Sequence, residues 1–187
     1  MTTQMHDTIL IEDQPLFMVG INGGRLFDPY ELGLHPLPHM TSCWRGYVCE
    51  YKSFQGKFLL DNLQINIDPQ EETSINGVKP ERDRCGLFSH VYASLHLPIP
   101  FTGNILAAGE FIQELYVHMG FHPAWKYKKV LELILSDGEV IEIRDISKQM
   151  EDVRKEMVKS PLTPGPNANR EQIEKWIEST FRRDHHK

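Results

Sequence analysis

The stretch 125–146 constrains the fold of this chain more than any other part of its sequence. Apolar and polar residues alternate in two runs, and Ser136-Asp137-Gly138 separates the runs. A period of two is typical of a half-buried strand, and Asp-Gly is a strong signal for a tight turn because glycine tolerates a positive φ. We therefore predict a β-hairpin here. Its arms can pair without a crossover, so the local sheet is expected to be antiparallel.

A second hairpin is predicted upstream, over residues 41–67. Its first arm is aromatic and β-branched, Gly56 marks the turn, and its second arm alternates apolar and polar residues up to Ile67. Gly46 lies within the first arm and indicates a bulge or a close backbone contact. Further strands are predicted over residues 8–21 and 87–107. In the second of these, the alternation places His90, Tyr92 and His96 on a polar, solvated face.

Three segments have the spacing of helices. Residues 109–119 place apolar side chains at helical intervals before a stop at Gly120, and residues 147–159 do the same after Ser147. In the last segment, 169–187, Asn169 and Gln172 match a capping box. The predicted fold is α+β, a mainly antiparallel β-sheet built from hairpins with one helix within the β region and two C-terminal helices.

The helices and the proline distribution suggest how the chain is divided. Residues 1–159 are expected to form a single α+β domain, followed by a Pro/Gly-rich linker at 160–168 and an amphipathic C-terminal helix at 169–187. The apolar stripe of that helix either docks on the domain or meets another chain. Docking is favoured because apolar patches of this size are uncommon on monomers, and a protein partner or self-association through the helix is the alternative.

Composition excludes several classes of protein. The 187 residues include 20 Lys and Arg against 26 Asp and Glu, and this net charge of -6 argues against nucleic-acid binding, which requires clustered cations. No apolar run is long enough to span a membrane, and the first residues do not resemble a secretory signal. The odd number of cysteines, Cys43, Cys49 and Cys85, favours a reduced, cytoplasmic setting.

The sequence Trp44-Arg45-Gly46-Tyr47 is the strongest candidate for a binding site. An arginine flanked by aromatic residues has the composition of a binding hot spot, because guanidinium offers fixed donors and aromatic rings bury a large area. The alternative is that Trp44 belongs to the core and that Arg45 is solvated or paired. The nearby glycine-rich Gly20–Arg25 lacks a following helix and a P-loop ending, so a turn is preferred there over an anion site.

Histidines suggest a second kind of site. His118 and His122 straddle the predicted stop at Gly120, and their candidate roles are ligand binding or stabilisation of the helix end. His35 and His39 are also four residues apart, but the prolines between them exclude an ordinary helix. Metal sites require three or four ligands, so neither a metal nor any other cofactor is predicted.

The motifs of common enzyme classes are not found in this sequence. We therefore expect a non-enzymatic binding or protein-interaction protein that uses Trp44, Arg45 and Tyr47, or His118 and His122. The alternative is a small hydrolase, metal-dependent or not, whose site is drawn from His90, His96, His118 and His122.

Overall fold

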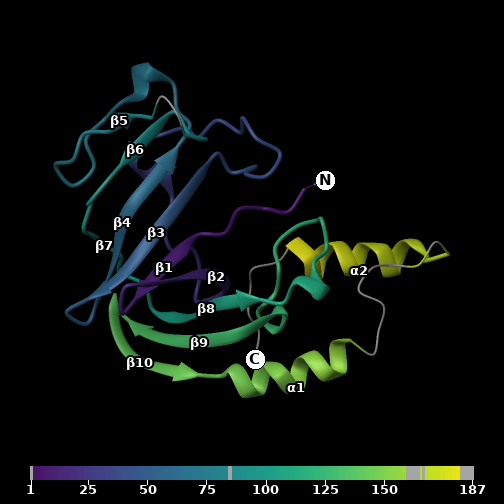
Figure 1. The fold of residues 1–187 in the computed structure, drawn as a ribbon. Helices are drawn as coiled ribbons and strands as arrows, with labels where there is room; N and C mark the ends of the chain where they lie inside the picture. Colours follow the sequence, from purple (N-terminus) through teal and green to yellow (C-terminus); the bar gives the residue numbers. More distant parts are fainter. Residues whose placement is uncertain (1, 84–85, 159–164, 166, 182–187) are drawn as a thin grey trace.

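The computed structural model spans residues 1–187, and the structure describes all of them except residues 1, 84–85, 159–164, 166 and 182–187; for residues 177–181 only the backbone is described. Ten strands curve around a common centre, and two helices lie to one side (Figure 1). The strands are β1 (Thr8–Ile11), β2 (Gln14–Asn22), β3 (Tyr47–Phe54), β4 (Lys57–Ile65), β5 (Glu81–Arg82), β6 (His90–Tyr92), β7 (Leu97–Pro98), β8 (Gly103–Phe111), β9 (Tyr127–Ser136) and β10 (Glu139–Asp145). The 3-10 turns are η1 (Pro29–Leu32), η2 (Pro69–Glu71), η3 (Gln113–Leu115) and η4 (Ala124–Lys126), and the helices are α1 (Ser147–Met157) and α2 (Arg170–Phe181).

The sheet closes on itself. Its strand order is β10-β9-β8-β2-β1-β3-β4-β6-β5, with β7 paired to β4, and β10 also pairs with β4. That last pairing joins Glu139 to Lys57, and the amide of Phe58 donates to the carbonyl of Gly138 at 2.8 Å. All neighbouring strands are antiparallel except β1 and β3, which run parallel. The predicted α+β class with a mainly antiparallel sheet and two C-terminal helices is confirmed.

Both predicted hairpins are present. β9 and β10 are joined by a turn in which Asp137 and Gly138 have φ values of 48° and 76°, as a two-residue hairpin turn requires. β3 and β4 are joined in the same way at Gln55 and Gly56. A bulge at Ile141, between Val140 and Glu142, interrupts the register of the β9–β10 hairpin, and the side chains of Ile141 and of Ile143 beyond it are exposed.

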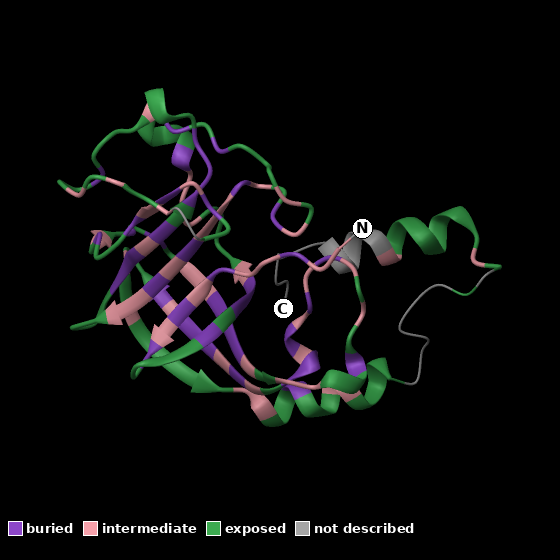
Figure 2. Ribbon diagram, turned by 45° about the horizontal axis from the view of Figure 1, so that its top comes forward, coloured by how far each residue is buried: buried purple, intermediate pink, exposed green. Residues whose placement is uncertain are grey.

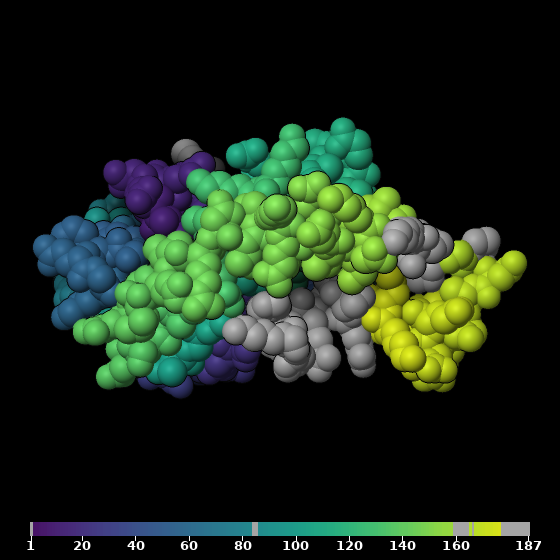
Figure 3. Space-filling view, turned by 90° about the horizontal axis from the view of Figure 1, so that it is seen from below, coloured from purple at the N-terminus to yellow at the C-terminus, as the bar shows by residue number. Residues whose placement is uncertain are grey.

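The main hydrophobic core fills the inside of the closed sheet. Buried and more exposed residues alternate along the strands, as the banding in Figure 2 shows. A smaller core lies outside the ring, where α1 packs against β9. There Met150 of α1 meets Val130 and Ala108 of the sheet. Figure 3 shows α1 lying across this face of the molecule, with α2 beyond its end.

The predicted helix at 109–119 is wrong. β8 continues through Phe111, which pairs with Tyr127 of β9, and only the short 3-10 turn η3 follows. The apolar spacing of this segment fits a helix equally well, so the pairing with β9 decides the outcome. Within the described residues, no helix has the length and apolar character needed to cross a membrane.

The alternating strand predicted over 91–97 is interrupted, and the β segment 87–107 forms β6, β7 and the first part of β8. Positive φ values at Ser94 (55°) and His96 (47°) turn the chain between β6 and β7, and a shared polar face is therefore not formed. Tyr92 and His90 are buried, at 0% and 1% exposed, so the predicted solvated face is wrong for them, whereas His96 is exposed as predicted. Period-two alternation requires a continuous strand, and these turns interrupt it.

The two C-terminal helices lie where the sequence places them. The capping box of α2 is formed: the amide of Gln172 donates to Asn169 Oδ1 at 2.9 Å, and the amide of Asn169 donates to Gln172 Oε1 at 3.0 Å. Most of the predicted linker 160–168 and the end of the chain lie outside the described residues.

Candidate functional site

A pocket of about 470 Å³ lies beneath the segment 25–45, beside the first residues of β1 and β3. It contains the predicted cluster, since Trp44, Arg45 and Tyr47 all line it. The other lining residues are Asp7, Ile21, Arg25, Leu26, Phe27, Asp28, Tyr30, Pro36, Pro38 and Tyr51. Five of the thirteen are aromatic, and the four charged residues are two arginines and two aspartates. Aromatic walls with a few polar groups are typical of small-molecule sites.

The parallel pairing of β1 with β3 positions the charged centre of the pocket. Thr8 lies opposite Glu50 in this pair, and both strands run in the same direction. Residues that precede the two strands therefore arrive at the same end of the sheet. Asp7 directly precedes β1, and Arg45 lies two residues before β3. This is why two residues 38 positions apart in sequence become neighbours.

Arg45 and Asp7 form a buried, two-point ion pair. Arg45 Nη1 donates to Asp7 Oδ2 at 2.7 Å, and Arg45 Nη2 donates to Asp7 Oδ1. The amide of Cys49 in β3 donates to the same Asp7 Oδ1 at 2.8 Å. Burial lowers the pKa of Arg45, but the charge of Asp7 and the hydrogen bonds to it outweigh burial and raise that pKa above its ordinary value. Arg45 therefore stays positively charged.

Aromatic rings surround this ion pair. The guanidinium carbon of Arg45 lies 4.7 Å from the centroid of the Tyr47 ring, and Phe27 packs edge-on against Tyr47 with ring centroids 6.2 Å apart. Burial raises the pKa of Tyr47 to about 12, so its hydroxyl stays protonated at neutral pH. Trp44 is 50% exposed, so the alternative that Trp44 belongs to the core is wrong. Its amide donates to Gln4 Oε1 at 3.2 Å, which fixes the backbone beneath it.

Gly46 holds the segment in place between Arg45 and Tyr47. Its φ is 74°, and a Cβ at this position would lie 2.7 Å from the carbonyl oxygen of Leu37. The sequence-based expectation of a close backbone contact is confirmed, although Gly46 lies just before β3 and not inside it. At the rim, Arg25 pairs with Asp28. The glycine-rich segment before Arg25 ends β2 without a following α-helix.

The structure does not bring the four histidines of the predicted hydrolase site together: His118 and His122 both contact Tyr116, whereas His90 and His96 lie elsewhere on the sheet. His118 is exposed and shares a hydrogen bond with the Tyr116 hydroxyl at 2.9 Å, whereas His122 is buried between Phe111 and Tyr116. His96 pairs with Asp61 at 2.7 Å on another part of the sheet. Among the described residues, no group of three or more His, Cys, Asp or Glu side chains is arranged to hold a metal ion.

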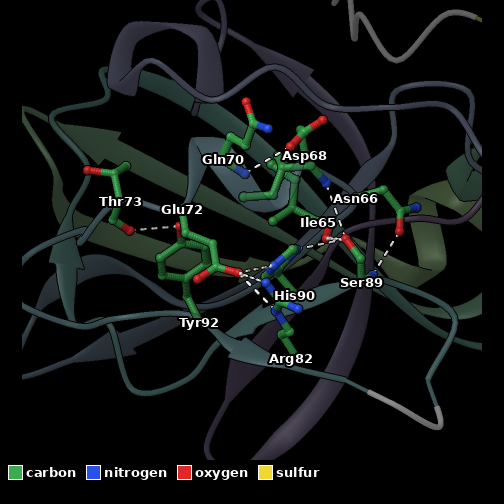
Figure 4. A network of polar contacts seen from close by, with 11 residues as sticks. Ile65, Asn66, Asp68, Gln70, Glu72, Thr73, Arg82, Ser89, His90 and Tyr92 are labelled. Atoms are coloured by element: carbon green, nitrogen blue, oxygen red, sulfur yellow. Dashed lines mark hydrogen bonds and ion pairs between the residues drawn. The ribbon is translucent and has the colours of Figure 1, made fainter.

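His90 lies in a polar network beside β6 (Figure 4). Its Nδ1 is 2.8 Å from Ser89 Oγ, and its Nε2 is 3.0 Å from Glu72 Oε1. These are the residue types of a nucleophile, a base and an acid, but Ser89 Oγ also accepts from the amide of Ile67 at 3.2 Å and contacts the carbonyl of Ile65 at 3.3 Å. These hydrogen bonds connect the Ser89 hydroxyl to the backbone at the end of β4 and to His90 of β6, so we assign Ser89 a structural role.

A second hollow of about 540 Å³ lies on the outside of the sheet. It is lined by outward-facing side chains of β3, β4 and β6, such as Val48, Gln64 and Val91, together with His6 and the partly exposed Phe17. Its only carboxylate, Glu50, accepts a hydrogen bond from Asn62 at 2.5 Å. This surface lacks the buried charges that distinguish the first pocket.

Comparison of the chain with protein-family models, curated proteins and solved structures gives no match. The candidate site therefore rests on the geometry described above. Sequence reasoning selected Trp44, Arg45 and Tyr47, which the structure brings together, and it missed Asp7 and Phe27. Phe27 belongs to a proline-rich segment without a regular period. Asp7 has no local signal, because its role depends on which strand lies next to β1.

Proposed function

We propose that this protein is a non-enzymatic binding protein that holds a small, planar aromatic ligand of zero net charge in the pocket beneath residues 25–45. The observation that supports this most directly is the position of Trp44, Arg45 and Tyr47 around one pocket of about 470 Å³. Pockets of roughly 300–1,000 Å³ are typical of small-molecule sites. An exposed indole at the rim offers a flat surface on which an aromatic ligand can stack.

The charges of the pocket favour an uncharged ligand. Asp7 is paired with Arg45, and Asp28 is paired with Arg25, so each arginine already has a carboxylate partner. An anionic or cationic ligand would have to compete with one member of a pair. A neutral ligand with donors and acceptors at its edge can meet both signs of charge and leave the ion pairs intact.

The same residues argue against catalysis in this pocket. Among the described residues that line it, none is His, Ser, Cys or Lys. Both of its carboxylates already accept hydrogen bonds from arginines. The hydrolase alternative receives less support, because His90 pairs with Glu72 and His96 with Asp61, away from His118 and His122, which both contact Tyr116.

Ligand-observed NMR with three matched probes tests this proposal. Benzamide is planar and neutral, cyclohexanecarboxamide replaces the aromatic ring with a saturated one, and benzoate replaces the amide with an anion. We expect saturation transfer to benzamide that exceeds transfer to the other two. Because small fragments bind weakly, affinities in the millimolar range are sufficient.

Trp44→Ala is the test variant and Phe54→Ala is its matched control. Both side chains are exposed aromatics, at 50% and 55%, but only Trp44 lines the pocket. We expect the benzamide signal to fall severalfold in Trp44→Ala and to persist in Phe54→Ala. Equal signals for benzamide and cyclohexanecarboxamide, or equal signals in the two variants, would refute the proposal.

A further inference from the structure

Lys126, in η4, is a buried lysine without a counter-ion. The residue is 6% exposed, and among the described residues no carboxylate forms an ion pair with its amine. Its amine faces an aromatic ring: Lys126 Nζ lies 5.4 Å from the centroid of the Trp125 ring. Buried ammonium groups are normally paired, so this arrangement disfavours the charged form.

The elements around η4 do not supply the missing negative charge. α1, β8 and β9 pack against it. The guanidinium of Arg154 in α1 donates to the carbonyls of Trp125 at 2.7 Å and Tyr127 at 2.5 Å, on either side of Lys126. Of the acidic side chains on α1, Glu151 and Asp152 pair with Lys155, and on the adjoining strands Glu110 of β8 and Lys128 of β9 are exposed. Among the ion pairs of the described residues, none joins Glu110, Glu151 or Asp152 to Lys126.

His122 is a second buried group in this region. Both of its ring nitrogens are shielded from solvent without a hydrogen-bond partner, and its ring centroid lies 4.7 Å from that of Phe111. Burial, together with the positive charge of Lys126, lowers the pKa of His122 to about 4, so His122 is neutral at physiological pH. Burial also lowers the pKa of Lys126 to about 8. A lysine in this state has a neutral, nucleophilic amine far more often than a solvated one.

We propose that Lys126 is a site of covalent modification at which its neutral amine reacts with small aromatic aldehydes to form an imine. The nitrogen lone pair attacks the carbonyl carbon, and the carbonyl oxygen takes a proton to give a carbinolamine. Loss of water, which takes up the remaining amine hydrogen, leaves the C=N bond. One aldehyde and one amine thus give one imine and one water, with no oxidant or reductant.

Access and selectivity follow from the same residues. The amine of Lys126 is not among the atoms fully shielded from solvent, in contrast to the ring nitrogens of His122. The ring of Trp125 next to the amine favours an aromatic aldehyde over an aliphatic one, because aromatic rings pack well against each other. This site is separate from the pocket around Arg45, so the two proposals can fail independently.

Reductive trapping tests the inference on the full chain. Benzaldehyde and cyanoborohydride are added to the native protein at neutral pH, and the labelled lysines are identified by peptide mass spectrometry. Lys128, exposed and two residues away, is the internal control. We expect Lys126 to be labelled faster than Lys128 by about tenfold or more, since a desolvated lysine amine is activated.

Unfolding the protein provides the second measurement. In concentrated urea the two lysines have similar surroundings, so the preference for Lys126 is expected to disappear, and Lys126→Arg is expected to lose the label in the native state. Equal labelling of Lys126 and Lys128 in the native protein would overturn the inference. So would a preference that persists in urea, because the folded structure would then not be its cause.

Discussion

Arg45 and Asp7 join the approaches to two parallel strands through a two-point ion pair, with Arg45 Nη1 2.7 Å from Asp7 Oδ2. The side chains of Arg45 and Asp7 are 25% and 4% exposed. A pair this deeply placed differs from a surface ion pair, because removing one partner leaves a charge buried without compensation. The same ion pair therefore holds β1 and β3 together and forms part of the pocket wall.

Replacing Arg45 is expected to destabilise the fold strongly. Arg45→Met removes the guanidinium from the buried Asp7 carboxylate, which still accepts from the amide of Cys49, and we expect a loss of about 3 kcal/mol in the free energy of unfolding. The loss is measured by urea denaturation, with circular dichroism as the signal of unfolding. The matched control is Arg25→Met, which removes an exposed arginine from the pair with Asp28 and is expected to cost less than about 1 kcal/mol.

The double variant Asp7→Asn/Arg45→Met separates loss of a contact from burial of an unpaired charge. Because the carboxylate is gone, we expect it to be more stable than Arg45→Met alone. A double variant less stable than the single one would contradict this explanation. It would indicate that both side chains stabilise the fold through independent contacts.

Gly46→Ala is expected to be more damaging than Gly33→Ala. Both glycines have nearly the same φ, 74° and 72°, but a Cβ at Gly46 meets the carbonyl of Leu37 and a Cβ at Gly33 meets nothing within 4 Å. The left-handed conformation alone costs about 1 kcal/mol for an alanine. We therefore expect about that loss at Gly33 and a loss about 1–3 kcal/mol larger at Gly46, measured by urea denaturation. Equal losses would mean that the contact with Leu37 relaxes freely.

His122 is expected to make the protein less stable in mild acid. Its pKa is lowered by burial and by Lys126 to about 4 in the folded state, against 6.5 in the unfolded chain. Between these values the unfolded chain binds a proton that the folded protein does not, so stability falls as the pH drops from 6.5 to about 4. The full effect is up to about 3 kcal/mol.

His122→Phe isolates this contribution. Phenylalanine fills the space between Phe111 and Tyr116 and does not titrate, so the difference in unfolding free energy between the variant and the wild type should grow in favour of the variant as the pH falls from 6.5 to 4. Parallel stability curves for the two proteins over this range would show that His122 is not buried in its neutral form.

Lys126→Met is expected to stabilise the protein at neutral pH. Burial lowers the pKa of Lys126 to about 8, below its ordinary value of 10.5. Above pH 8 the folded protein releases this proton before the unfolded chain does, so wild-type stability rises as the pH increases from about 8 toward 10.5. The variant lacks the buried charge and should be more stable at pH 7 by up to about 3 kcal/mol.

The measurement runs from pH 7 to about 9.5, below the range in which tyrosines of the unfolded chain ionise. We expect the advantage of Lys126→Met to shrink over this range, because the wild type is losing its buried charge. An advantage that is independent of pH would instead point to better packing of the methionine side chain.

Local sequence patterns determined much of this fold. Alternating apolar and polar residues specified both hairpins, with a Gln-Gly turn between β3 and β4 and an Asp-Gly turn between β9 and β10. Asn169 and Gln172 specified the start of α2. Each of these signals acts within a few residues. The choice of Trp44, Arg45 and Tyr47 as neighbours at one site also came from sequence. The glycine at position 46 also indicated a bulge or a close backbone contact, and the structure has the contact.

Only the tertiary structure decided the remaining features. The pairing of β8 with β9 turned residues 109–111 into strand, and the pairing of β10 with β4 closed the sheet. The parallel pairing of β1 with β3 brought Asp7 to Arg45, and the packing around η4 buried Lys126 and His122. These outcomes depend on contacts between residues far apart in the chain, and no short stretch of sequence contains the information about which strand becomes the neighbour of another.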